Sequence, residues 1–240
     1  MDLLLLSNST NHGEPRLAHA RDALRELYDD REVLFVPYAL ADHESYTGVT
    51  AEAFAEAGLR LRGVHSFADP AAALASAEAV FVGGGNSFRL LRAARRLGLL
   101  DAIRAAVRGG ARYGGASAGT NLACPTIRTT NDMPIVEPGG FDALGLVVFQ
   151  INAHYLEHSP GSTHMGETRA ERIGEFLEEN DVPVLGLREG SWLRVGPQEG
   201  VHLYGRDAVL FRRGADPREL PAGSDLSADL SGPARFDEPA

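Results

Sequence analysis

The chain has 240 residues, of which 44% are hydrophobic, and a formal net charge of −10. This length and composition suit one globular α/β domain with a buried core, while the acidic balance argues against a nucleic-acid partner, because no basic face could neutralise phosphates. All 23 basic residues are arginine, which excludes reactions that need lysine, such as Schiff-base and PLP chemistry, a Ser–Lys dyad or a P-loop.

The single cysteine, Cys124, excludes an internal disulfide and a multi-cysteine zinc site. It favours a reducing, cytoplasmic compartment. The opening residues MDLLLLSNST lack a basic region, and no later stretch approaches eighteen consecutive apolar residues. We therefore expect a buried strand at the start, rather than a signal peptide, and no membrane partner.

In the first half of the chain, short apolar runs alternate with stretches of helical spacing. These patterns predict strands over 2–7, 32–39, 59–65, 77–85 and 111–117, and helices over 15–28, 50–58, 87–98 and 99–110. Buried strands that alternate with helices indicate a mostly parallel sheet with helices on both faces.

The second half of the chain shows a different pattern of predicted elements. It predicts a strand over 144–152, an amphipathic helix over 166–180, a strand over 182–187, and an antiparallel meander at the sheet edge built from 191–196, 200–205 and 208–214. From about residue 215 the sequence is rich in Pro, Gly, Ser and Asp without periodicity. We expect a single domain over 1–214 and a disordered, acidic tail over 215–240 that has no function.

The segment GASAG, residues 115–119, matches the nucleophile-elbow pattern G-x-S-x-G. Such a turn exposes Ser117 between a strand and a helix, and the flanking glycines remove clashes inside the turn. The helix start would also point backbone N–H groups at a developing oxyanion. The competing interpretation is a packing turn of small residues. Cys124 is the rival nucleophile, but a lone cysteine before a proline is more often a core residue.

A second glycine turn, VFVGGGNSFRLL over 80–91, also joins a strand to a helix. Backbone N–H groups at 83–85 could approach a ligand without obstruction from a Cβ atom. The turn is interpreted either as an oxyanion loop for Ser117 or as a simple tight turn. Asn86 follows at the helix N-cap, where it could cap the helix or face the pocket.

A serine nucleophile needs a general base, and without lysine the obvious choice is histidine. His154 directly follows the strand predicted to end at residue 152, so it should emerge at the sheet edge that carries Ser117. Among the other seven histidines, His158 and His164 lie in the next predicted loop and are weaker candidates.

Two acidic residues compete to orient that base. Glu189 follows the predicted strand 182–187, so strand-end geometry favours it. Asp132 lies on a predicted surface loop, where it could instead shape the pocket. The residues alone leave both assignments open.

With these residues assembled, the sequence resembles peptidase E, the α-aspartyl dipeptidase family of serine exopeptidases. The resemblance runs from the first strand to the strand near 211 and omits the tail. It rests on the motifs VGGGNSF, SAGTNLACPTIRTTNDMPIV, FDALGLVVFQIN, GETRAERI and LREGSW.

The resemblance implies a sheet like that of the class I glutamine amidotransferases. It also implies removal of N-terminal aspartate from dipeptides and some short peptides, without metal or cofactor, by a homodimer. The site residues that it implies are Ser117 as nucleophile, His154 as base, Glu189 as third member, the amides of Gly85 and Ala118 as oxyanion hole, and Asn86 and Arg169 as ligands of the aspartyl carboxylate.

The chain departs from the family pattern at three points. Ala116 replaces a tryptophan of some relatives, which suggests a roomier pocket, and the loop 155–165 differs by about one residue, which affects the reach of Arg169. Relatives also vary in the third triad member, so Asp132 stays a candidate. The alternatives to the dipeptidase are a related exopeptidase or amidase, such as a cyanophycin-degrading enzyme, and a catalytically silent binder of small molecules. The run TNDMP favours the dipeptidase.

Overall fold

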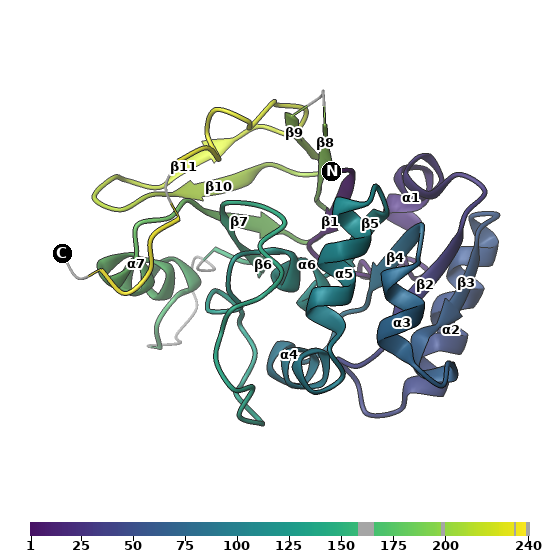
Figure 1. Ribbon diagram of the computed structural model, residues 1–240. Helices are drawn as coiled ribbons and strands as arrows, with labels where there is room; N and C mark the ends of the chain where they lie inside the picture. The colour runs from purple at the N-terminus through teal and green to yellow at the C-terminus, as the bar shows by residue number, and fades with distance from the viewer. Residues whose placement is uncertain (158–165, 198–199, 233, 239–240) are drawn as a thin grey trace.

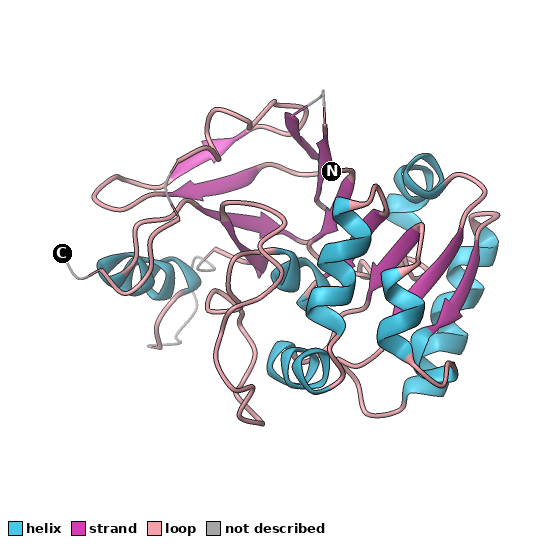
Figure 2. Cartoon of the chain, in the orientation of Figure 1, coloured by secondary structure: helices cyan, strands magenta, loops and turns pink. Residues whose placement is uncertain are grey.

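The computed structural model describes residues 1–157, 166–197, 200–232 and 234–238. His158 and His164, the weaker candidate bases, lie outside these ranges. The strands form two sheets, a larger one that runs from the right to the top centre of Figure 1 and a smaller one on the left, and helices pack against both (Figures 1 and 2). Within the described residues, no helix has the length and apolarity that crossing a membrane requires.

The larger sheet has seven strands in the order β3-β2-β4-β5-β1-β8-β9. Its strands are β1 (Leu3–Leu6), β2 (Glu32–Val36), β3 (Arg60–Gly63), β4 (Ala79–Val82), β5 (Arg112–Ala116), β8 (Trp192–Gly196) and β9 (Gly200–Tyr204). The first five in the order are parallel, and β8 and β9 add an antiparallel hairpin. The parallel strands therefore bring their carboxyl ends to one edge.

Helices cover both faces of this sheet because its buried strands present apolar side chains in both directions. Leu4 and Leu6 of β1 share one cluster with helices α1 and α2, whereas Leu3 and Leu5 share another with the helices of the opposite face. The helices are α1 (Arg21–Tyr28) after the short 3-10 helix η1 (Ala18–Ala20), α2 (His43–Glu56), α3 (Pro70–Ala75) after η2 (Val64–Ser66), α4 (Ser87–Arg96), α5 (Leu99–Arg108) and α6 (Ala118–Ala123).

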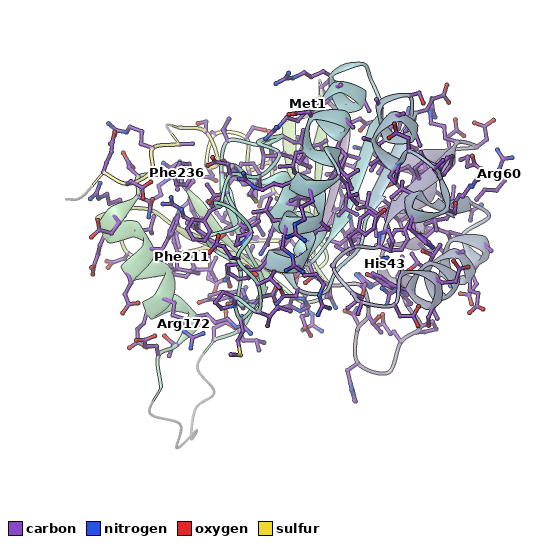
Figure 3. All side chains as sticks on the ribbon, turned by 60° about the horizontal axis from the view of Figure 1, so that its bottom comes forward. Met1, His43, Arg60, Arg172, Phe211 and Phe236 are labelled. Atoms are coloured by element: carbon purple, nitrogen blue, oxygen red, sulfur yellow. The ribbon has the colours of Figure 1, made fainter. Side chains whose placement is uncertain are left out.

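The smaller sheet has four strands in the order β11-β10-β7-β6. They are β6 (Gln150–Tyr155), β7 (Val184–Arg188), β10 (Ala208–Phe211) and β11 (Arg218–Leu220), with β6 and β7 parallel and the others antiparallel. Helix α7 (Arg169–Glu179) packs Ile173 and Leu177 against one face, and the other face joins the main core. In Figure 3, Phe211 and Arg172 mark this end of the molecule, and His43 and Arg60 mark the other.

The α/β fold with a mostly parallel sheet is confirmed, but two details of the prediction are wrong. The expected meander is divided between the sheets, because β10 pairs with β7 rather than with β9. The strand expected over 144–152 begins only at Gln150, because the backbone N–H groups of Leu144 and Leu146 bond to carbonyls of Leu122 and Ala123 at the end of α6. The finer likeness to glutamine amidotransferases stays a prediction.

The tail is the third correction, since its described residues, 215–232 and 234–238, include a strand and buried side chains where disorder was expected. It contributes β11 and buries Leu220, Leu226 and Leu230. The N–H of Leu226 donates to the Val201 carbonyl of β9 at 2.7 Å, so the tail covers an edge strand that would otherwise be open. The irregular spacing of these leucines explains why no periodicity marks them.

We predict that Leu226→Ala destabilises the fold by about 2–5 kcal/mol, as expected when a fully buried leucine leaves a cavity. The matched control is Leu97→Ala, whose side chain is 42% exposed and whose loss should change stability by only about 0.5 kcal/mol. Urea unfolding of both variants measures the difference. Equal stabilities would mean that the tail does not belong to the cooperative core.

Candidate active site

Ser117 lies on a sharp turn between β5 and α6, with φ of 53° and ψ of −110°. Residues other than glycine rarely adopt such dihedrals. The turn is held because the Ser117 N–H donates to the Leu6 carbonyl at 3.0 Å and its own carbonyl accepts from Asn121 at 2.9 Å. This is the backbone that the elbow motif predicts.

The two glycines of the motif are sterically required. A Cβ atom at Gly115 would lie 2.6 Å from the carbonyl group of Gly119. A Cβ atom at Gly119 would overlap the carbonyl oxygen of Val82 in the neighbouring strand β4. The steric argument drawn from the sequence is therefore confirmed, with β4 as a further contact.

The sequence predicts His154 directly after a strand. In the structure it lies inside that strand, β6. The β6–β7 register shifts between Ala153 and Tyr155, so His154 occupies a bulge, and its φ of 55° is left-handed. Its backbone N–H donates to Ser7 Oγ at 2.9 Å, and Ser7 Oγ donates to the Leu187 carbonyl at 2.7 Å. The buried hydroxyl of Ser7, the residue directly after β1 of the other sheet, therefore holds the bulge.

The side chains of Ser117, His154 and Glu189 form one hydrogen-bonded chain. His154 Nε2 lies 2.8 Å from Ser117 Oγ, and His154 Nδ1 lies 2.7 Å from Glu189 Oε1. A carboxylate beside Nδ1 keeps the proton there and leaves Nε2 free to accept from the serine hydroxyl. Glu189 follows β7 directly, as the strand-end argument expected.

Asp132 does not contact His154 in this arrangement. Its Oδ2 atom accepts from the Ser87 N–H at 2.7 Å and from the Thr130 hydroxyl at 3.1 Å. Asp132 thus bonds to the start of α4, while its side chain lines the same cavity as Ser117. The geometry pairs Glu189, and not Asp132, with the histidine.

The glycine turn after β4 packs directly against the serine. A Cβ atom at Gly84 would lie 3.1 Å from Ser117 Cβ, and one at Gly85, where φ is 131°, would lie 2.7 Å from the Ala39 carbonyl oxygen. Among the described residues, the backbone N–H groups of Gly85 and Ala118 donate to no acceptor. Both are free to receive an oxyanion.

A cavity of about 720 Å³ opens above Ser117. The described residues that line it are Ser9, Arg16, Leu40, Asp42, Ser45, Tyr46, Val49, Gly84, Gly85, Ser117, Asp132 and His154. Its lining thus includes the carboxylates of Asp42 and Asp132 and the guanidinium of Arg16. No group of three or more metal-ligating side chains is found in the described part of the chain.

Asn86 and Arg169, the expected carboxylate ligands, do not line this cavity. Asn86 caps α4: its Oδ1 accepts from the Arg89 N–H at 3.0 Å and its Nδ2 donates to the Met133 carbonyl at 2.9 Å. Arg169 begins α7, where burial and the charge of Arg172 lower its pKa against an opposing attraction from Glu189. Arg169 therefore lies within electrostatic range of the triad carboxylate.

Three further residues concern the pocket and the rival nucleophile, and one of them, Cys124, is the core residue that the sequence predicts. Ala116 is buried in the core cluster that also contains Tyr46 and is not among the residues that line the cavity. Cys124 is buried, and burial raises its pKa to about 12, which keeps the thiol protonated at neutral pH. Arg16 was missed, because no motif surrounds it and only the fold brings it near Ser117.

The comparisons with known proteins cover nearly the whole chain. The model of peptidase family S51 matches residues 3–202. The chain is 63% identical over 238 residues to "Peptidase E" of Streptomyces coelicolor, covering 99% of this chain and 98% of that one. It is 47% identical over 230 residues to "Probable alpha-aspartyl dipeptidase" of Drosophila melanogaster, covering 94% and 96%.

One solved structure shows the same fold at low sequence identity. The crystal structure of a peptidase from an acI-B1 actinobacterium superposes with a TM-score of 0.67 at 16% identity, covering 94% of this chain and 96% of that one. At this identity the likeness concerns the fold alone.

We predict that Ser7→Ala slows the reaction of Ser117 with a fluorophosphonate by about 10-fold or more, while the protein stays folded. The change leaves the His154 N–H and the Leu187 carbonyl without their buried partner, which costs about 1–3 kcal/mol and frees the bulge to relax. Intact-mass spectrometry measures the labelling rate.

The matched control for Ser7→Ala is Ser227→Ala. Its hydroxyl likewise accepts from a strand N–H, that of Val201, at 2.9 Å and donates to an oxygen, Asp225 Oδ1. It lies on the tail beside β9, so its loss should leave the labelling rate unchanged. An equal rate in both variants and wild type would show that Ser7 does not position His154.

Proposed function

The chain belongs to peptidase family S51, and we propose that it hydrolyses dipeptides with N-terminal aspartate, using Ser117 as nucleophile. Serine peptidase and α-aspartyl dipeptidase function follow from the close relatives. The observation that carries the assignment to particular residues is the hydrogen-bonded chain Ser117–His154–Glu189, whose serine and histidine line the cavity.

In the first half of the reaction, Ser117 Oγ attacks the carbonyl carbon of the aspartyl residue while His154 Nε2 takes the hydroxyl proton. The carbonyl oxygen becomes an oxyanion, which accepts hydrogen bonds from the N–H groups of Gly85 and Ala118. Glu189 stabilises the imidazolium that forms and keeps its ring oriented. His154 then gives the proton to the leaving amine, the C–N bond breaks, and an aspartyl ester of Ser117 remains.

In the second half, water replaces the amine. His154 Nε2 removes a proton from the water, whose oxygen attacks the ester carbonyl. The same two amides hold the second oxyanion. When it collapses, the ester C–O bond breaks, Ser117 Oγ regains the proton from His154, and free aspartate leaves. No metal or cofactor is required for this sequence.

The free α-amino group of the substrate needs a negative partner, and Asp132 suits that role. Its Oδ2 atom is used by Ser87 and Thr130, whereas its Oδ1 atom makes no hydrogen bond within the described residues. Oδ1 is thus available to an ammonium group in the cavity. This assigns Asp132 to substrate binding from its place beside the start of α4.

We further propose a homodimer and a cytoplasmic location. Exposed apolar side chains on the segment between α6 and β6, Met133, Ile135, Phe141 and Val148, support self-association. The free cysteine supports a reducing compartment. A monomer mass in light scattering at micromolar concentration would contradict the dimer.

We predict that the wild-type protein hydrolyses Asp-Leu but neither Leu-Leu nor a β-aspartyl dipeptide at a comparable rate. Ser117→Ala should lower kcat/KM for Asp-Leu by about 10⁴- to 10⁶-fold, because the nucleophile and its acyl-enzyme are lost. Quantifying released leucine by chromatography measures both. Full hydrolysis by Ser117→Ala would remove Ser117 as nucleophile, and equal rates on all peptides would favour the broader exopeptidase.

The same assay separates the two carboxylates. Glu189→Gln should lower kcat by about 10²- to 10⁴-fold, because the imidazolium loses its partner. Asp132→Asn should mainly raise KM, since its carboxylate is placed to bind the substrate rather than the histidine. The reverse pattern, with kcat lost in Asp132→Asn and retained in Glu189→Gln, would make Asp132 the third triad member.

A further inference from the structure

Arg16 is the one arginine among the described residues that line the cavity. It lies in the segment between β1 and η1, at the edge of the sheet where β5 presents Ser117. The steps described above, from attack to deacylation, use Ser117, His154, Glu189 and two backbone amides. They give Arg16 no role, although its charge faces the same space.

The guanidinium of Arg16 has no anionic partner among the described residues. Its Nε atom is buried without a hydrogen bond, and it forms no ion pair within the described part of the chain. Arg95, Arg128 and Arg194 also have an unbonded Nε, but each donates through a terminal nitrogen to a carbonyl or carboxylate. Arg16 thus retains unused donors where burial makes unused donors costly.

The side chain of Tyr46 holds Arg16 in place. Arg16 Cζ lies 5.0 Å from the centre of the Tyr46 ring, a cation–π distance. Burial raises the pKa of Tyr46, while the Arg16 guanidinium and the Gly84 amide oppose that rise by stabilising charge on the phenol oxygen. Tyr46 therefore ties Arg16 to the glycine turn that flanks Ser117, which fixes the guanidinium relative to the nucleophile.

Such a preordered guanidinium is suited to a carboxylate, which it can bind through two parallel hydrogen bonds. The other charged groups of the wall, Asp42 and Asp132, would repel a carboxylate and attract an ammonium group. We propose that Arg16 determines specificity by binding a carboxylate of the dipeptide. This inference rests on the proposed function and adds Arg16 to Asn86 and Arg169, the carboxylate ligands that the family resemblance implies.

An Asp-X dipeptide carries two carboxylates, the aspartyl side chain and the C-terminal group, and both offer the same chemistry. Asn-Leu lacks the first, and the amide of Asp-Leu lacks the second. Comparing hydrolysis of these peptides with that of Asp-Leu identifies the group that Arg16 binds.

The test variant is Arg16→Met, which keeps an unbranched apolar chain over Tyr46 but removes the charge. We expect KM for Asp-Leu to rise about 10- to 100-fold with a smaller change in kcat, as for loss of one charge-assisted hydrogen-bonded pair. Arg16→Lys should recover part of the loss. Wild type should discriminate against the peptide that lacks the bound carboxylate, and Arg16→Met should not.

The matched control is Arg62→Met. Arg62 also stacks on an aromatic ring, with Cζ 4.0 Å from the centre of Phe67, but it lies on β3 away from the cavity. Its removal should leave KM unchanged. If Arg16→Met behaves like Arg62→Met, or discriminates among the three peptides as wild type does, Arg16 does not bind the substrate carboxylate.

A binding measurement keeps this test separate from the test of catalysis. Calorimetry of Asp-Leu with Ser117→Ala, and with Ser117→Ala carrying Arg16→Met, should give a Kd about 10- to 100-fold weaker in the double variant. Equal Kd values would overturn the role of Arg16 even where wild type hydrolyses Asp-Leu. A weaker Kd in the double variant would support that role even if wild type failed to hydrolyse Asp-Leu.

Discussion

The triad depends on the few hydrogen bonds that join the end of β1 to the second sheet. Ser7 Oγ receives the N–H of His154 and donates to Leu187, while Asn8 Oδ1 receives the N–H of Gly190 at 2.8 Å, directly after Glu189. The two residues that directly follow β1 therefore hold the base and the backbone beside its carboxylate. Ser117 reaches the same point because β5 is the parallel neighbour of β1. Both sheets converge on one strand end.

Three residues of the site have a backbone conformation that residues other than glycine rarely adopt. Ser117 and His154 have φ values of 53° and 55°, and Gly85 has a φ of 131°. Such conformations cost about 1–3 kcal/mol at a residue other than glycine and persist only where neighbours enforce them. Hydrogen bonds from neighbouring residues hold both conformations. Thr120 Oγ1 donates to the Leu6 carbonyl at 2.6 Å beside the serine turn, and Ser7 Oγ accepts from the N–H of His154 in the bulge. Rigid sheets thus maintain the strain that exposes the reacting atoms.

A site residue could be predicted from the sequence when the residues that fix its position are close to it in the chain. The elbow at Ser117 was predictable because the glycines that relieve its clashes are two positions away, and Glu189 because a parallel strand ends just before it. The bulge at His154 was not predictable, because it depends on pairing with β7 some thirty residues later and on Ser7, which follows β1. Nothing near Arg16 in sequence indicates its place, because Tyr46 and the cavity come from other elements.

The charged side chains in the cavity help to explain why an enzyme of this kind would act on small peptides. The chain has a net charge of −10, yet its proposed substrate is also anionic, so long-range attraction cannot draw it in. Surface charges are screened over about 8 Å at physiological salt, whereas partly buried groups are screened much less. Inside the cavity, recognition therefore depends on the nearest charges, a guanidinium at Arg16 and a free carboxylate oxygen at Asp132. On the proposed assignment, a zwitterionic peptide satisfies both at once. An internal segment of a protein has no free ammonium group for Asp132, so the same charges that favour a dipeptide disfavour cleavage within a chain.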